Sequence, residues 1–292
     1  MRLLNVESPT FAEFLDDERP AYVIASHRWV EDNEATFQDV KDCRNTSGGG
    51  YQKVKAFAEY VKSYIVHIRW LWIDTCCINK ESAAELSEAI NSMFDWYQNA
   101  ELCIAYLADV ATAEDMRGFE NSEWFKRGWT LQELLAPQIV VFVTAAWQVI
   151  GHKGSASGSN PVLSVGRELG DTTARVTDLP AEVLLNYDAS ASLSDEGKLR
   201  WMDGRTTTRP EDMSYALFGI LDVRLPAIYG EKGIGARQRL EAAIHQRNIL
   251  AAQQAEERRN IAAWLSSADP WTNHESARQL HEPGTGAWLL QH

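Results

Sequence analysis

The chain has 292 residues, 45% of them apolar and 10% aromatic, which suits a globular protein of one large or two modest domains. Its formal net charge of −13, without any cluster of Lys and Arg, argues against nucleic acid as a partner. No apolar run is long enough to span a bilayer, no signal peptide opens the chain, and the cysteines lack metal-ligand spacing, so we expect a cytoplasmic protein without a metal site.

The first half of the chain alternates short apolar runs with segments of helical spacing. The apolar runs predict buried strands over residues 21–26, 70–73, 102–107 and 139–143. Helical spacing between them predicts helices over 51–68, 82–98 and 122–136. Ser82 is the expected N-cap of the second helix, and Glu85 is expected to complete a capping box. This order is typical of an α/β fold with a parallel sheet and helices on both faces.

The second half of the chain changes character after the fourth predicted strand. Residues 151–170 are rich in Gly and Ser and predict a loop, and short helices are expected over 179–196. Pro210 opens a helix expected to run to about Leu221, and a long helix is predicted over 235–258. We therefore divide the chain into a core (1–150), the rest of that domain with a helical C-terminal extension (151–250), and a linker (251–292) towards a missing downstream module.

Polar side chains gather where the first two predicted strands end, and ligands of parallel sheets bind at the carboxyl ends of strands. The candidates are Ser26, His27, Arg28, Trp29, Asp74 and Asn79. Ser26 and Arg28 suit phosphate or ribose oxygens, with salt bridges to the abundant acids as the alternative for Arg28. Asp74 is either a ribose or base contact, a second carboxylate, or the cap of the next turn.

The remaining three candidates also have two interpretations each. His27 is expected to be a satisfied structural histidine rather than a base. Asn79 forms a turn by default, with a ligand contact as the alternative. Trp29 either covers a cleft or closes the core.

A Trp and a Glu four residues apart stand out in the segment 127–137. This spacing places Trp129 and Glu133 on one face of a short helix, which Pro137 ends. An acid beside an indole becomes partly desolvated, so Glu133 is the candidate catalytic carboxylate. The alternative is a Glu bonded to the helix N-terminus or to Arg127. Trp129 is either a wall of the cleft or a core residue.

Other reactive residue types have weaker cases. Cys77 lacks a neighbour in the sequence that would activate it as a nucleophile. Arg205, Arg209 and Asp212 are expected to form a structural ion-pair group at a helix start.

Three blocks, residues 22–29, 70–80 and 127–137, together resemble the fungal HET (heterokaryon incompatibility) domain. Residues 209–220 and 225–231 look like sequences that often follow that domain. The tail from 262 to 290 resembles the linker that precedes a NACHT module or ankyrin repeats in fungal NOD-like receptors. Because no phosphate-binding Gly-rich loop with Lys is present, such an ATPase module would lie beyond His292.

The resemblance carries expectations about fold and function. The family is linked to regulated cell death after non-self recognition and is regarded as a distant relative of TIR domains, which implies a TIR/flavodoxin-like sheet. Several TIR domains hydrolyse NAD with a Glu in a Trp-x-x-x-Glu helix, and Trp129 and Glu133 match that motif. The polar stretch after Trp29 and the chain after Val143 depart from the TIR pattern.

The resemblance therefore implies NAD as substrate, no bound cofactor, nicotinamide and an ADP-ribose as products, and self-association for activity. Glu133 would be catalytic, and the substrate contacts would come from Ser26, His27, Arg28, Trp29, Asp74, Asn79 and Trp129. One alternative is a non-enzymatic signalling module that works through homotypic contacts. A second alternative is another nucleotide-processing enzyme with its site at the same strand edge.

Overall fold

The computed structural model describes residues 1–15, 17–30, 33–154 and 166–267. Contacts divide the chain into two units, Met1–Ala242 and Ala243–His292. The first unit contains the sheet and its helices, and the second contains the larger part of the long helix α11 (Lys232–Ser267). The expected linker over 251–292 is therefore helical as far as Ser267, and its remainder lies outside the described residues.

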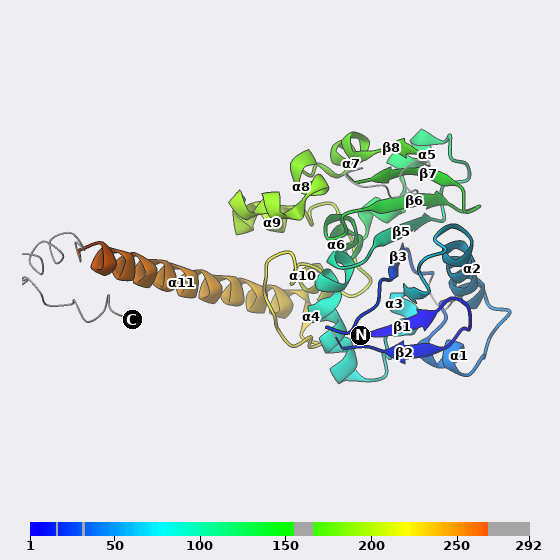
Figure 1. The fold of residues 1–292 in the computed structure, drawn as a ribbon, viewed down its shortest axis with the longest axis horizontal. Helices are drawn as coiled ribbons and strands as arrows, with labels where there is room; N and C mark the ends of the chain where they lie inside the picture. Colours follow the sequence, from blue (N-terminus) through cyan, green and yellow to red (C-terminus); the bar gives the residue numbers. More distant parts are fainter. Residues whose placement is uncertain (16, 31–32, 155–165, 268–292) are drawn as a thin grey trace, which may run out of the picture. The chain divides into compact units, whose positions relative to one another are not determined.

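An eight-stranded sheet forms the centre of the first unit, in the order β2-β1-β4-β3-β5-β6-β7-β8 (Figure 1). The strands are β1 (Arg2–Asn5), β2 (Phe11–Glu13), β3 (Val23–His27), β4 (Trp70–Trp72), β5 (Leu102–Leu107), β6 (Val140–Thr144), β7 (Val149–Lys153) and β8 (Arg167–Glu168). The central strands β4, β3, β5 and β6 are parallel, which confirms the α/β class. The sheet is nevertheless mixed, because β1, β2 and β7 pair antiparallel with their inner neighbours.

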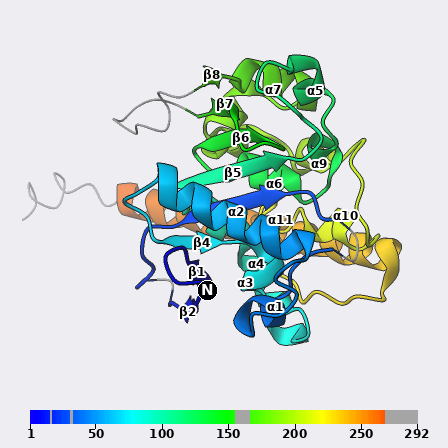
Figure 2. The ribbon, with the colours of Figure 1, turned by 90° about the vertical axis from the view of Figure 1, so that its right-hand side faces the viewer.

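Helices connect the strands and cover the sheet. The first group is α1 (Phe37–Lys41), α2 (Gly49–Tyr64), α3 (Asp74–Cys77), α4 (Ala83–Gln98), α5 (Met116–Glu120), η1 (Glu123–Lys126) and α6 (Thr130–Leu135). The second group is α7 (Gly170–Thr177), α8 (Ala181–Leu185), η3 (Tyr187–Ser192), α9 (Asp195–Arg200) and α10 (Asp212–Tyr215). Figure 2 shows α2 in front of the sheet and α6 behind it. Because both faces are covered, every residue of β3 and β6 is buried.

The connections of β3 and β5 position the site. After β3 the chain continues to β4 on one side, whereas β5 pairs with the other side of β3. Ligands of such sheets bind outside the carboxyl ends of the strands at the point where the order reverses. At this point Ser26 and His27 lie in register with Ala105 and Tyr106 of β5.

The structure corrects the predicted loop over 151–170. Residues 151–153 belong to β7 and residues 167–168 to β8, while 155–165 lie outside the described residues. Gly151 lies in β7 beside β8, and this strand position requires glycine because a Cβ there would collide with the carbonyl oxygen of Arg167 on the adjacent strand. Gly151 therefore reflects close strand packing, whereas Gly154 and Gly166, with φ of 137° and 94°, have the positive φ that favours glycine.

Two local predictions for helices are also wrong in part. The helix expected to run to Leu221 is only α10, and bonds from Leu217 N to the Ser214 carbonyl and from Phe218 N to the Tyr215 carbonyl continue it as tight turns. Ser82 does cap α4, but the Glu85 carboxylate does not complete the capping box. It accepts instead from Asn79 N at 2.7 Å and from Arg2 at 2.6 Å.

Candidate active site

Glu133 lies at the centre of a buried polar chain behind β3. It sits on α6, all of whose residues are buried, and the Glu133 residue is only 6% exposed. Its Oε2 accepts a hydrogen bond from Ser26 Oγ, and Ser26 Oγ accepts from the indole N–H of Trp124 at 2.8 Å. Sequence reasoning missed Trp124, because its separation from Ser26 and Glu133 follows no helical or strand spacing.

This environment keeps Glu133 largely neutral at pH 7. The pKa of Glu133 is raised to about 8, first by burial and second by the nearby charge of Asp74. The hydrogen bond from Ser26 and the positive charges of Arg127 and Arg205 lower this pKa, but they do not outweigh burial. A cationic ligand beside the carboxyl would favour its ionised form.

Two buried cations hold the ends of α6. At its start, Arg205 donates to the Arg127 carbonyl at 2.8 Å and to Thr130 Oγ1 at 3.2 Å. At its end, Lys153 Nζ donates to the carbonyls of Leu134 at 2.8 Å and Pro137 at 2.7 Å. Burial lowers the pKa of Arg205 to about 10 and that of Lys153 to about 7. The helix that carries Glu133 is therefore fixed at both ends by side chains from distant segments.

Trp129 immediately precedes α6 and belongs to a different cluster. Burial raises the pKa of Asp212, and hydrogen bonds from Trp129 and Tyr229 oppose this shift. The Tyr229 hydroxyl donates to Asp212 Oδ1 at 2.9 Å, and the Arg209 guanidinium lies 4.2 Å from the centre of the Tyr229 ring. The expected ion-pair group of Arg205, Arg209 and Asp212 is not formed as predicted, because Arg205 binds the start of α6 instead.

A cavity of about 940 Å³ opens beside the carboxyl ends of β3 and β4. Its lining residues are Arg28, Trp29, Val30, Glu34, Ala35, Thr36, Phe37, Gln38, Asp39, Asn45, Thr75, Ile78, Asn79, Lys80, Glu81, Ala108, Arg127 and Thr208. Of the predicted site residues, Arg28, Trp29 and Asn79 are in this lining. Ser26, His27, Asp74, Trp129 and Glu133 are not. The size suits a ligand site, for which volumes of roughly 300–1,000 Å³ are usual.

Trp29 lines the cavity and is bonded to Asp74, whose charge acts on Glu133. The Trp29 indole N–H donates to Asp74 Oδ2 at 2.8 Å, and the Lys80 ammonium lies 3.6 Å from the centre of the indole. Trp29 is 41% exposed, while the charge of Asp74 acts on the buried Glu133. Asp74 therefore links the wall of the cavity to the buried carboxyl.

His27 is buried between two acids. Its Nε2 lies 3.6 Å from Glu34 Oε2 and 3.9 Å from Asp74 Oδ1. Neither ring nitrogen has a hydrogen-bond partner among the described residues, so the satisfied histidine expected from the sequence is not found. Burial would raise the pKa of Glu34, but His27 and Lys53, whose Nζ lies 2.5 Å from Glu34 Oε1, outweigh it and lower that pKa to about 2.

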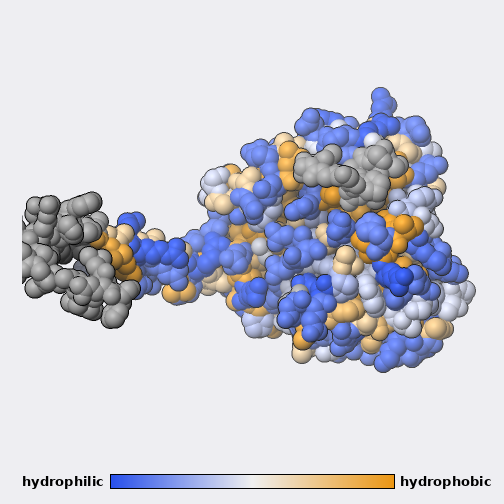
Figure 3. Space-filling model, viewed as in Figure 1, coloured by the Kyte–Doolittle hydropathy of each residue, from blue (hydrophilic) through white to orange (hydrophobic). Residues whose placement is uncertain are grey.

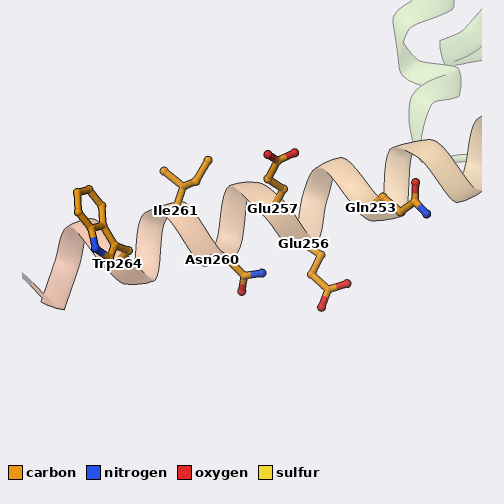
Figure 4. Close-up of a pocket in the computed structure, with 6 residues that line it drawn as sticks. All are labelled: Gln253, Glu256, Glu257, Asn260, Ile261 and Trp264. Carbon is orange, nitrogen blue, oxygen red and sulfur yellow. The ribbon is translucent and has the colours of Figure 1, made fainter.

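Other features of the described residues do not indicate a catalytic or metal site. The hollow along α11 is lined by one helix alone, and Figure 4 shows its six side chains projecting from successive turns. In the described part of the chain, no three His, Cys, Asp or Glu side chains are grouped to hold a metal ion. None of the helices described combines the length and apolar character needed to cross a membrane.

Comparison with known proteins agrees with the resemblance. Residues 22–121 match the family model described as "Heterokaryon incompatibility protein (HET)". The chain is similar to vegetative incompatibility protein HET-E-1 of Podospora anserina, with 42% identity over 234 residues, which are 77% of this chain and 16% of that protein. The chain thus spans about one sixth of the length of this curated relative. No solved structure matches.

Proposed function

Because the chain carries a heterokaryon incompatibility (HET) domain, we propose that it is the effector part of a fungal non-self recognition protein and hydrolyses NAD to nicotinamide and ADP-ribose. The single observation that supports this chemistry best is the buried carboxyl of Glu133, whose pKa is raised to about 8 and which lies within reach of the charge of Arg127, a residue of the cavity wall. Strongly shifted carboxyl groups beside clefts are typical of catalytic sites.

The proposed reaction uses the positive charge of the substrate itself. The nicotinamide ring of NAD is a pyridinium cation, and its approach would lower the pKa of Glu133 and leave the carboxylate ionised. As the bond between nicotinamide and ribose breaks, its electron pair stays with the nicotinamide, which departs neutral. The anionic Glu133 then stabilises the positive charge that develops on the ribose. Water adds to the ribose carbon, releases a proton and gives ADP-ribose.

The other residues of this region have supporting roles in the proposal. Ser26 holds one carboxyl oxygen of Glu133 through its hydroxyl, and Trp124 in turn fixes that hydroxyl. Because Glu133 does not line the cavity, side chains of the cavity wall have to move for the nicotinamide riboside end of NAD to reach it, and Trp29, which is bonded to Asp74, is our candidate for this movement. His27, Asn79 and Trp129 remain predicted substrate contacts.

The biological setting is part of the same proposal. The much greater length of the relative supports a longer parent protein, in which a downstream NACHT or repeat module would control the domain. Self-association would assemble active copies, and the NAD consumed would be that of the cytoplasm. Cell death would follow from NAD depletion.

Nicotinamide release tests the enzymatic part of this proposal. The protein is fused to an inducible dimerisation tag, incubated with NAD, and its products are separated by chromatography. We expect nicotinamide and ADP-ribose in equal amounts from the wild type, and a rate at least about 100-fold lower from Glu133→Gln. Glu123→Gln is the control, because this exposed carboxylate only pairs with Lys126. Equal rates for the wild type and Glu133→Gln would reject the assigned role of Glu133.

One observation favours the non-enzymatic alternative. Glu133 is hydrogen-bonded inside the protein and does not line the cavity, as expected of a purely structural carboxyl. In that case the domain would signal through homotypic contacts alone. The assay separates the two, because a homotypic module releases no nicotinamide in any assembled state. Incubation with NADP, ATP and GTP tests whether another nucleotide is processed instead.

A further inference from the structure

We propose that Arg28, Lys80 and Arg127 form an anion site that binds the phosphate groups of a nucleotide in the cavity. The inference deepens the proposed function, on which it rests for the identity of the nucleotide. It concerns how the cavity binds its ligand and does not require that the ligand is cleaved. It can therefore be tested by binding alone.

The three cations come from separate segments and meet in one cavity. Arg28 follows β3, Lys80 follows α3, and Arg127 lies between η1 and α6. The parallel sheet brings these segments together at the carboxyl ends of its central strands, where ligands of such sheets bind. Their convergence is therefore a property of the fold rather than of one basic stretch of sequence.

None of the three cations forms a salt bridge within the described part of the chain. Lys80 contacts the face of Trp29, and Arg127 donates to Thr208 Oγ1 at 3.3 Å. Lys80 lies near the charge of Asp74, and Arg127 near that of Glu133. Because none of the three cations is in a salt bridge among the described residues, they can pair with an anion that comes from outside the chain.

The acids that line the cavity do not cancel this positive charge. Glu34 is neutralised locally by Lys53, whose Nζ lies 2.5 Å from its Oε1. Asp39 is engaged in capping α1, where its carboxylate accepts from the Thr36 hydroxyl at 2.6 Å and from Asn45 at 2.7 Å. Among the described lining acids, only Glu81 is exposed and outside any ion pair. With Glu34 paired to Lys53, the cations Arg28, Lys80 and Arg127 face two further lining carboxylates, Asp39 and Glu81, which leaves one positive charge in excess on the wall.

A nucleotide phosphate suits this wall better than an acidic segment of another protein. The cavity is concave and of a size usual for small ligands, at about 940 Å³. Two of its three cations are guanidinium groups, whose planar fork matches the oxygens of phosphate. The aromatic side chains of Trp29 and Phe37 also line the cavity and give an apolar surface for a base or a sugar.

Calorimetric titration of the full chain tests the site with four probes. The probes are ADP-ribose, ADP, inorganic pyrophosphate and adenosine, which has no phosphate. We expect the first three to bind and to bind more weakly at high salt. Arg28→Gln and Arg127→Gln should each weaken ADP-ribose binding by roughly tenfold, since each removes a charge-assisted hydrogen bond.

Matched controls separate a specific site from a general charge effect. Arg200→Gln removes the same charge from an exposed i,i+4 pair with Glu196 and should leave ADP-ribose binding unchanged. Circular dichroism checks that each variant is folded. If no phosphate probe binds, or if Arg28→Gln and Arg127→Gln bind ADP-ribose as tightly as the wild type does, the inference is wrong.

The inference and the proposed hydrolysis can fail separately. If Arg28→Gln and Arg127→Gln lose ADP-ribose binding while the wild type never releases nicotinamide, the phosphate site is supported and the proposed hydrolysis is rejected. If nicotinamide is released and the KM for NAD is unchanged in both variants, the proposed hydrolysis is supported and the phosphate site is rejected.

Discussion

At the scale of single residues, the burial of Glu133 makes the stability of the fold depend on pH, because ionising this carboxyl at alkaline pH destabilises the folded state. Its pKa is about 8 in the folded protein and 4.5 in a solvated chain, so the folded state binds more protons between these values. The stability contributed by the neutral carboxyl is complete below pH 4.5 and is lost as the pH rises through 8. A glutamine would avoid this loss, which is consistent with a residue retained for function.

We therefore predict that Glu133→Gln stabilises the protein at high pH. Relative to the wild type, the free energy of unfolding should rise by on the order of 3 kcal/mol at pH 9 and differ little at pH 4.5. Urea titrations at pH 4.5, 7 and 9 measure this difference. A difference that is the same at all three pH values would show that Glu133 ionises normally in the folded state.

Ser26→Ala is predicted to shift the same ionisation upward. The hydrogen bond from Ser26 lowers the pKa of Glu133, so its loss should raise that pKa above 8. If NAD cleavage needs the carboxylate, the pH at half-maximal kcat moves up by a similar amount. Ser192→Ala, which changes an exposed serine, serves as control. An unchanged pH profile in active Ser26→Ala would mean that Glu133 does not limit the rate through its charge.

The sequence predicts that this site contains a desolvated acid, but it does not predict which side chains contact that acid. A desolvated acid beside an indole is expected from the Trp-x-x-x-Glu spacing, and Glu133 is indeed buried. The indole that reaches it through Ser26 is however Trp124, while Trp129 binds Asp212. Helical spacing reports neighbours along one helix, whereas Ser26 lies 107 residues from Glu133 and meets it only through the sheet.

At the scale of elements, the contact between Lys153 of β7 and the end of α6 is predicted to depend on pH. The pKa of Lys153 is about 7 in the folded protein and 10.5 in a solvated chain, so the folded state binds fewer protons between these values. The stability of the wild type should therefore rise with pH from about 7 to 10.5 through this group. Lys153→Met lacks this contribution and leaves the Leu134 and Pro137 carbonyls without their donor.

Urea unfolding of Lys153→Met and the wild type measures this effect. The wild type should gain stability over the variant as the pH rises from 7 to 10, by on the order of 1.4 kcal/mol per pH unit at most. Glu133 is unchanged in both proteins, so its own pH dependence cancels in the difference. A difference that stays flat over this range would mean that Lys153 keeps its proton when buried.

The four central strands are predictable from the sequence, and the edge strands are not. The central strands β3, β4, β5 and β6 are covered on both faces, so they appear as continuous apolar runs. The edge strands β2 and β8 have three and two residues, too few to show any alternation. Their pairing depends on the neighbouring strand rather than on their own pattern.

At the scale of the whole molecule, the contact pattern predicts that the first unit folds by itself. A chain that ends at Ala242 retains the sheet and its helices. It should show a cooperative thermal transition, with a helical signal reduced by the missing residues of α11. Circular dichroism measures both properties. A broad transition or a loss of near-ultraviolet signal would show that the first unit needs the second to fold.

Charge also acts on the molecule as a whole. The net charge is −13, and the face drawn in Figure 3 is mostly hydrophilic with separate apolar patches. A strongly acidic protein repels an anionic nucleotide at long range. The cations Arg28, Lys80 and Arg127 would therefore have to attract the ligand locally, and added salt weakens both effects.

The most direct test of the central claim follows NAD and survival together in fungal cells that express the protein fused to an inducible dimerisation tag. After dimerisation of the wild type, the account predicts that cellular NAD falls before viability does, and that Glu133→Gln, expressed at the same level, prevents both. Glu123→Gln should behave as the wild type does. Death of cells expressing Glu133→Gln, with their NAD intact, would contradict the account and leave homotypic signalling as the function.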